Sequence, residues 1–114
     1  MEGSEPSPAS PVPCFSPAQF LRSVRFIATD HTGAVFFARH ALDRMAERDV
    51  TNRDVLTVLR RGELRDGRVT ATGKPNEVKG VVCAPLDGGR KVGVVTILIN
   101  NGKVFVKTVM WLDK

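Results

Sequence analysis

The segment of residues 38–50 combines proton-transferring and phosphate-binding side chains at helical spacing. At roughly 100° per residue, one side of such a helix carries His40, Arg44, Glu47 and, at the border, Arg48. The opposite side carries Ala38, Ala41, Leu42 and Met45. An imidazole transfers protons near neutral pH and a guanidinium binds phosphate oxygens as a fork, so this polar side could bind a phosphate and act on it. The alternative is an ordinary solvated helix face, and the helix alone leaves both interpretations open.

Length and charge limit the class of protein. The chain has 114 residues and a net charge of +5, which predicts one domain with a modest core and favours a polyanionic partner without establishing one. Cys14 and Cys83 are far apart and form no C-x-x-C pair, so we expect neither a metal site nor a cofactor. No apolar run approaches the roughly 20 residues of a membrane helix, and the start lacks a basic secretory region. We therefore expect a cytoplasmic protein, with origin in a longer secreted effector as the open alternative.

Residues 1–15 are rich in proline and serine, which predicts a disordered tail before a single domain over residues 16–114. Ser16, Pro17 and Gln19 form the pattern of a capping box and predict a helix to about Arg25. A further helix begins after Thr51 and ends at Gly62. With the helix of His40, these make about three N-terminal helices.

β-Branched residues at period two predict strands over residues 77–84, 91–100 and 103–112, after a polar segment 63–76 with a weak strand near 68–70. The dipeptide Asn101-Gly102 predicts a two-residue turn that pairs Asn100 with Lys103. The expected fold class is therefore α+β, with the helices packed on one face of a small antiparallel sheet.

This register sorts the side chains of the last hairpin by face. The helix-facing side is expected to hold Val95, Ile97, Ile99, Val104, Val106, Thr108 and Met110. The other side mixes lysines with aromatic rings and suits RNA, because bases stack on rings and lysines bind phosphates. Its RNA-binding candidates are Phe105, Lys103, Thr96 and Trp111. The alternative is a face covered by the 63–76 segment or by a partner chain.

Several short motifs resemble those of one bacterial family of small uncharacterised domains. They are H-A-x-x-R-M-x-x-R from His40 to Arg48, the segment Val55 to Leu59, Gly62-Glu63-Leu64, V-K-G at Val78 to Gly80, and V-K-T-V from Val106 to Val109. That family is related to the MqsR and RelE toxins. The resemblance covers about Val35 to Trp111, and it implies the RelE-like ribonuclease fold with metal-independent RNA cleavage.

Such cleavage needs a base, an acid and cations, because the ribose 2′-hydroxyl attacks the neighbouring phosphate. His40 could be the base or the acid. Arg44 and Arg48 could bind phosphate, and Lys79 and Lys107 are candidates from the sheet. The chain contains no tyrosine, whereas many toxins of this group use one.

The prediction is an endoribonuclease of a toxin-antitoxin or effector system, with RNA, and mRNA in particular, as substrate and a cognate antitoxin or immunity protein as a possible partner. The alternatives are a non-catalytic RNA-binding module and a pure protein-interaction module with the same fold.

Overall fold

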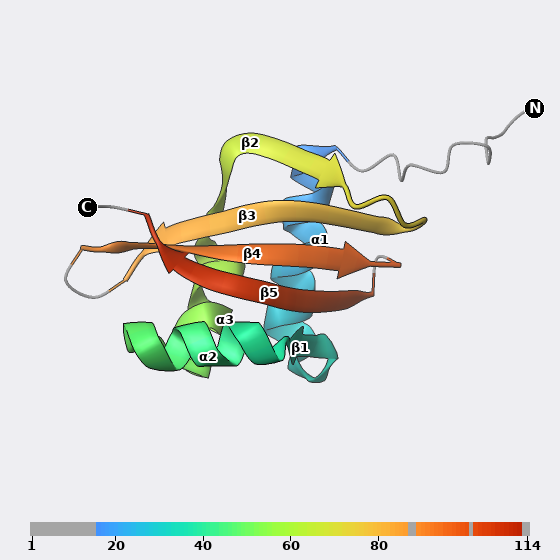
Figure 1. Cartoon of the computed structure of the whole chain (residues 1–114). Coiled ribbons are helices and arrows are strands. Elements are labelled where there is room, and N and C mark those ends of the chain that lie inside the picture. Colours follow the sequence, from blue (N-terminus) through green and yellow to red (C-terminus); the bar gives the residue numbers. More distant parts are fainter. Residues whose placement is uncertain (1–15, 87–88, 101, 113–114) are drawn as a thin grey trace, which may run out of the picture.

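Three α-helices and a five-stranded mixed sheet make an α+β fold (Figure 1). The computed structural model describes residues 16–86, 89–100 and 102–112. The tail expected over residues 1–15, and Cys14 within it, lie outside the described residues. In the described part, no helix is long and apolar enough to cross a membrane.

The helices are α1 (Pro17–Asp30), α2 (Arg39–Arg48) and α3 (Asn52–Arg61). The capping box expected at Ser16 is confirmed, and so is the helix start expected after Thr51: the Ser16 hydroxyl accepts from the Gln19 N–H and the Thr51 hydroxyl from the Asp54 N–H, each at 3.1 Å. The structure adds that Thr51 and Asp54 also form a capping box. These side chains satisfy backbone donors that a helix start leaves unpaired. Helix α1 continues well past Arg25, because its buried stripe extends to Ile27 and Ala28.

The strands are β1 (Val35–Phe37), β2 (Glu63–Ala71), β3 (Glu77–Pro85), β4 (Lys91–Ile99) and β5 (Lys103–Trp111), in the sheet order β1-β5-β4-β3-β2. The last three agree with expectation within one residue. Two expectations are wrong. Most of the segment 63–76 forms strand β2, and the sheet is mixed because β1 pairs with β5 in parallel.

The β4–β5 turn is one residue longer than the Asn-Gly dipeptide predicts. Ile99, not Asn100, pairs with Lys103, and Asn100 has a φ of 53°. Side chains alternate between faces along a strand, so this shift turns every residue of β4 to the other face. The buried side of β4 accordingly holds Val92, Val94, Thr96 and Leu98. Val95, Ile97 and Ile99, expected in the core, are only half-buried.

A β-bulge shifts the register of β5 against β4 by one residue. Val95 pairs with Thr108 but Thr96 pairs with Val106, so one extra residue lies on β5 between these pairs. As a result Val104, Val106 and Val109 are all buried, while Thr108 and Met110, expected in the core, are half-buried. The burial expected for Val104 and Val106 is confirmed.

Helices α1 and α3 cover one face of the sheet, and α2 contacts the sheet mainly through β5. Gly80 permits close packing of α1, since a Cβ there would lie 2.9 Å from the Phe20 ring. Of the three helices expected on one face, α2 packs along β5 near the sheet edge, and its buried residues join the same core as those of α1 and α3. A helix beside a strand edge buries a narrow stripe, so Ala41 and Met45 are buried whereas Leu42 is 46% exposed.

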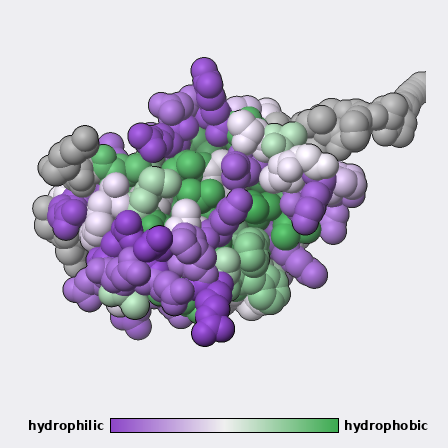
Figure 2. Space-filling model, in the orientation of Figure 1, coloured by the Kyte–Doolittle hydropathy of each residue, from purple (hydrophilic) through white to green (hydrophobic). Residues whose placement is uncertain are grey.

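Among the described residues, no helix lies on the opposite face of the sheet. By register, one row across it runs through Thr70, Lys79, Ile97, Phe105 and Phe36. Figure 2 shows the same side as Figure 1, with a hydrophobic patch over the central strands and hydrophilic residues around it, including those over α2. We call this uncovered surface the outer face.

Candidate phosphate-binding site on helix α2

Strand β1 leads directly into α2, so that the helix begins beside the middle of β5. The N–H of Ala38 donates to the carbonyl oxygen of Val106 at 2.9 Å, and the helix begins at the next residue. From Ala38 to Arg48 a helix rises about 15 Å at 1.5 Å per residue. From Val106 to Trp111 a strand rises about 17 Å. Arg48 and Trp111 line a common pocket, so α2 and β5 run side by side in the same direction.

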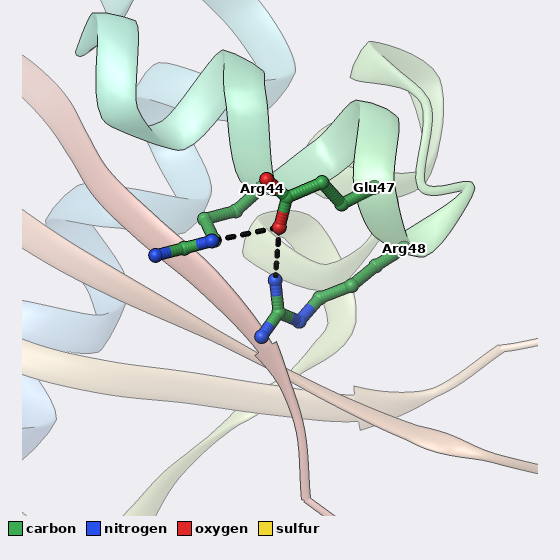
Figure 3. A network of polar contacts seen from close by, with 3 residues as sticks. All are labelled: Arg44, Glu47 and Arg48. Atoms are coloured by element: carbon green, nitrogen blue, oxygen red, sulfur yellow. Dashed lines mark hydrogen bonds and ion pairs between the residues drawn. The ribbon is translucent and has the colours of Figure 1, made fainter.

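Two guanidinium groups share one carboxylate on the exposed side of α2 (Figure 3). The Nη1 atom of Arg44 lies 2.7 Å from Oε1 of Glu47, and Nη1 of Arg48 lies 3.4 Å from the same oxygen. The side chains of Arg44 and Arg48 are 38% and 33% exposed. Each guanidinium has five N–H donors, so both retain donors for a further anion. We call His40, Arg44, Glu47 and Arg48 the α2 row.

The charges of the α2 row act on the carboxyl group of Glu47. The hydrogen bond and the charge of Arg44 lower the pKa of Glu47 below its ordinary value of 4.5, and Arg48 and His40 lower it further. Near neutral pH the Glu47 side chain is therefore an ionised carboxylate, the form that pairs with both arginines.

The order of side chains along the α2 row is suited to phosphate chemistry. Residues 40, 44 and 47 follow at steps of four and three, which brings them onto one face of a helix. Arg44 is therefore flanked by a histidine on one side and a carboxylate on the other. From His40 to Glu47 the helix rises about 10.5 Å. Side chains that lean toward one another across this distance can contact the same phosphodiester.

Glu47 is the member of this site to which the sequence interpretation gave no catalytic role. Its position on the polar side of the helix was recognised, but a glutamate three residues after an arginine most often makes a solvated ion pair. The available signal was chemical: transfer of a proton to and from a phosphodiester needs two groups, and His40 supplies only one.

A pocket of about 320 Å³ adjoins the end of the α2 row. Its lining consists of Arg48, Asp49, Asp54, Leu86, Arg90 and Trp111. The guanidinium carbon of Arg90 lies 4.0 Å from the centre of the Trp111 ring, which is a cation–π contact. Arg48 is common to the pocket and to the α2 row, so the two are continuous. We call this cavity the Trp111 pocket.

The structure brings together only some of the residues selected from the sequence. His40, Arg44 and Arg48 share α2, and the exposed Lys107 follows Val106, the residue bonded to the start of that helix. Lys79 is on β3, two strands from β5 and thus about 10 Å away. It does not join the α2 row.

Of the four RNA-binding candidates, only Phe105 and Lys103 are neighbours, two residues apart on β5. Phe105 lies on the outer face, and Lys103 is exposed at the start of β5. Trp111 lies in its pocket beside α2. The assignment of Thr96 is wrong: this residue is fully buried, and its hydroxyl donates to the carbonyl of Val94 at 2.9 Å. The turn correction explains the error, because it turns Thr96 into the core.

Within the described ranges, no three side chains of His, Cys, Asp or Glu gather where they could hold a metal ion. The family model described as a domain of unknown function, DUF4258, matches residues 37–111. The match includes the α2 row, the Trp111 pocket and four of the five strands. Comparisons with curated proteins and with solved structures found no significant match.

Proposed function

The chain belongs to this family of domains of unknown function, and we propose that it cleaves RNA at a phosphodiester bound by α2, with no metal taking part. One observation carries the proposal. The guanidinium of Arg44 lies on one helix face between His40 and Glu47, two side chains that can transfer protons. Cleavage by an internal nucleophile requires such an arrangement of base, anion-binding group and acid.

In the proposed reaction the 2′-hydroxyl oxygen of a ribose attacks the adjacent phosphorus. The carboxylate of Glu47 takes the hydroxyl proton, and the imidazolium of His40 gives a proton to the 5′-oxygen as its bond to phosphorus breaks. The products are a 2′,3′-cyclic phosphate and a 5′-hydroxyl. Arg44 and Arg48 stabilise the extra negative charge on the non-bridging phosphoryl oxygens, which is greatest in the transition state.

The outer face supports the binding of a single strand beside this site. Phe105 and Phe36 are paired neighbours there, and Phe36 is 47% exposed. Bases stack on aromatic rings without regard to sequence, and lysines contact the backbone phosphates. In this proposal Lys107 contacts a phosphate beside the α2 row, and Lys79 and Lys103 contact more distant ones.

The proposal extends to a relationship with the MqsR and RelE toxins, as the motifs from His40 to Val109 imply, and to action in the cytoplasm under control by an antitoxin or immunity protein. The absence of tyrosine from the chain is compatible with this reaction, because the pair of His40 and Glu47 supplies both proton transfers.

A cleavage assay with purified protein tests the proposal. We expect single-stranded RNA to be cut in the presence of EDTA, leaving 2′,3′-cyclic phosphate ends, and induction of the protein in a bacterium to arrest growth. A matched oligonucleotide with 2′-deoxyribose throughout should remain intact, because it lacks the nucleophile. Cutting of that oligonucleotide, or loss of RNA cutting in EDTA, would contradict the mechanism.

A second candidate function is binding without cleavage, to RNA or to a protein. The observation that favours it is the apolar centre of the outer face, where Val81, Val95 and Ile97 are half-buried and none of the described helices covers them. An RNA-binding module would leave RNA uncut, with an affinity that falls steeply as salt rises. A pure protein-interaction module would have no RNA affinity at any salt concentration.

A further inference from the structure

We infer that the Trp111 pocket binds a guanine base, and that it selects the nucleotide next to the phosphate bound by α2. This inference rests on the proposed function, because it assigns the substrate specificity of the same site. It is carried by the chemistry of the pocket lining and by the residue that the pocket shares with the α2 row.

The pocket offers a flat ligand both apolar contact and fixed polar groups. The half-buried side chains of Leu86 and Trp111 supply the apolar walls. The ring of Trp111 also supports the guanidinium of Arg90 at 4.0 Å, so the donors of this exposed arginine are oriented before a ligand arrives. Preorganised donors lose little entropy on binding.

The polar groups of the pocket match the edges of guanine. Guanine presents two adjacent acceptors, O6 and N7, to which an arginine can donate two hydrogen bonds. It also presents two neighbouring donors, N1–H and N2–H, which suit the two oxygens of one carboxylate. In the inferred complex, the guanidinium of Arg90 donates to O6 and N7, and the carboxylate of Asp49 accepts from N1–H and N2–H. No other RNA base has both a pair of adjacent acceptors and a pair of adjacent donors.

Asp49 is the carboxylate available for this role. It is exposed at the end of α2 in a left-handed conformation with φ of 59°. The other carboxylate of the pocket, Asp54, already accepts the N–H of Thr51 at 3.0 Å in the capping box of α3. Asp54 is thus committed to the helix start, whereas Asp49 can turn both oxygens toward a ligand.

Arg48 connects base recognition to the α2 row. Its guanidinium lies 3.4 Å from the Glu47 carboxylate and also lines the Trp111 pocket. A nucleotide with its base in the pocket therefore has its phosphate beside the residues proposed to act on it. The inferred specificity is cleavage at guanosine.

Trp111 is the one tryptophan of the chain, so its fluorescence reports directly on the pocket. The experiment titrates the His40→Ala variant separately with the 3′-monophosphates of guanosine, adenosine, cytidine and uridine, and with inorganic phosphate. We expect guanosine 3′-monophosphate to change the emission with an affinity at least tenfold higher than the other three nucleotides. Inorganic phosphate should neither reproduce the change nor be needed for it.

Asp49→Asn provides the specific variant. Asparagine also adopts left-handed conformations readily, so the end of α2 should be preserved, while one of the two acceptors becomes a donor that faces a guanine donor. We expect the preference for guanosine to fall at least tenfold. The matched control is Asp43→Asn, an exposed aspartate of the same helix outside the pocket, which should keep the preference.

Equal affinity for all four nucleotides, a response to inorganic phosphate of the same size, or an unchanged preference in Asp49→Asn would overturn the inference. These results are independent of catalysis, because His40→Ala lacks the proposed acid. RNA cleavage with no nucleotide preference would support the proposed function and contradict the inferred selection of guanine. Guanosine-selective binding in a protein that cuts no RNA would support the pocket and contradict the proposed function.

Discussion

The N–H of Ala38 and the carbonyl oxygen of Val106 form a 2.9 Å hydrogen bond that joins the start of α2 to the middle of β5. This bond continues the parallel pairing of β1 by one residue. The chain then turns directly into the helix that carries His40 and Arg44. The α2 row is therefore fixed to the sheet through its backbone, and a change in the core beneath Val106 should also reach the site.

Val106→Asp should destabilise the domain by several kcal/mol, about 3 to 5, because it places an unpaired charge at a fully buried position. Urea unfolding followed by circular dichroism measures the change. Lys103→Asp is the control, since this exposed position on the same strand should tolerate the carboxylate within about 0.5 kcal/mol. Equal stability of the two variants would contradict the assignment of faces in β5.

Gly62→Ala should destabilise the domain by about 1–3 kcal/mol through overpacking. A Cβ at this position would lie 2.6 Å from the carbonyl oxygen of Val58 and 2.7 Å from that of Cys83. Both are backbone atoms, so α3 and β3 would have to separate. Gly33→Ala is the matched control, because a Cβ there meets nothing within 4 Å. A thermal melt should separate the variants, and a Gly62→Ala melt as high as that of Gly33→Ala would refute the close approach.

Much of this fold could be predicted from local signals in the sequence. The capping box at Ser16 and the cap residue Thr51 identified two helix starts, because a cap depends on residues within one turn. The β-branched residues identified the strands of the last hairpin. These features need no knowledge of distant parts of the chain.

The register of the sheet could not be predicted, because it depends on one residue in a turn and one in a bulge. Asn101-Gly102 favours a two-residue turn, yet Ile99 pairs with Lys103, and the faces of β4 change with that choice. Both faces of β4 are apolar, so hydrophobicity did not distinguish them. The error moved Thr96 from the core to the RNA-binding candidates.

The polar side of α2 could be predicted from the helical period of the sequence alone, but the residues from other elements that lie next to it could not. Only the folded chain brings Arg90, which precedes β4, and Trp111, at the end of β5, close to Arg48. No motif in the sequence joins these three residues. The Trp111 pocket is for this reason a product of tertiary structure.

The titration of Glu47 gives a test of the α2 row that does not depend on activity. Its pKa in the folded protein should lie below 4.5, and Arg44→Ala should raise it, because Arg44 is the main cause of the lowering. Carbon-detected NMR of the side-chain carboxyl measures both values. Since the folded pKa is lowered, the ion pairs favour the folded state above the unfolded pKa, and this contribution is lost as pH falls through the folded value.

Arg44→Lys should keep part of the lowering of the Glu47 pKa, because a lysine preserves the charge but not the planar fork. If cleavage uses Glu47 as the base, the acidic limb of the rate profile should shift to higher pH in Arg44→Ala together with the NMR midpoint. A midpoint that stays in place in Arg44→Ala would remove the basis for pairing these two residues.

His40→Ala should reduce RNA cleavage by about 10² to 10⁴-fold, the usual contribution of a general acid, while RNA affinity and stability stay nearly unchanged. The reason is that the imidazole is exposed and opposite the buried Ala41 and Met45. Arg44→Ala should instead weaken both binding and cleavage, because a guanidinium that binds phosphate in the ground state also stabilises the transition state. Arg44→Lys should restore part of each.

The chain supplies a matched control for His40, because its one other histidine, His31, is exposed beyond the end of α1 and outside the α2 row. His31→Ala should therefore cut RNA at the wild-type rate in the same assay. Glu47→Gln should lose cleavage as His40→Ala does, since the amide cannot accept the 2′-hydroxyl proton. If His40→Ala keeps full activity, or if it unfolds the domain while His31→Ala does not, then His40 is not the acid. The alternative of solvated residues makes the opposite forecast for the α2 row, in which His40, Arg44 and Glu47 tolerate substitution within about 0.5 kcal/mol of stability and with no change in activity.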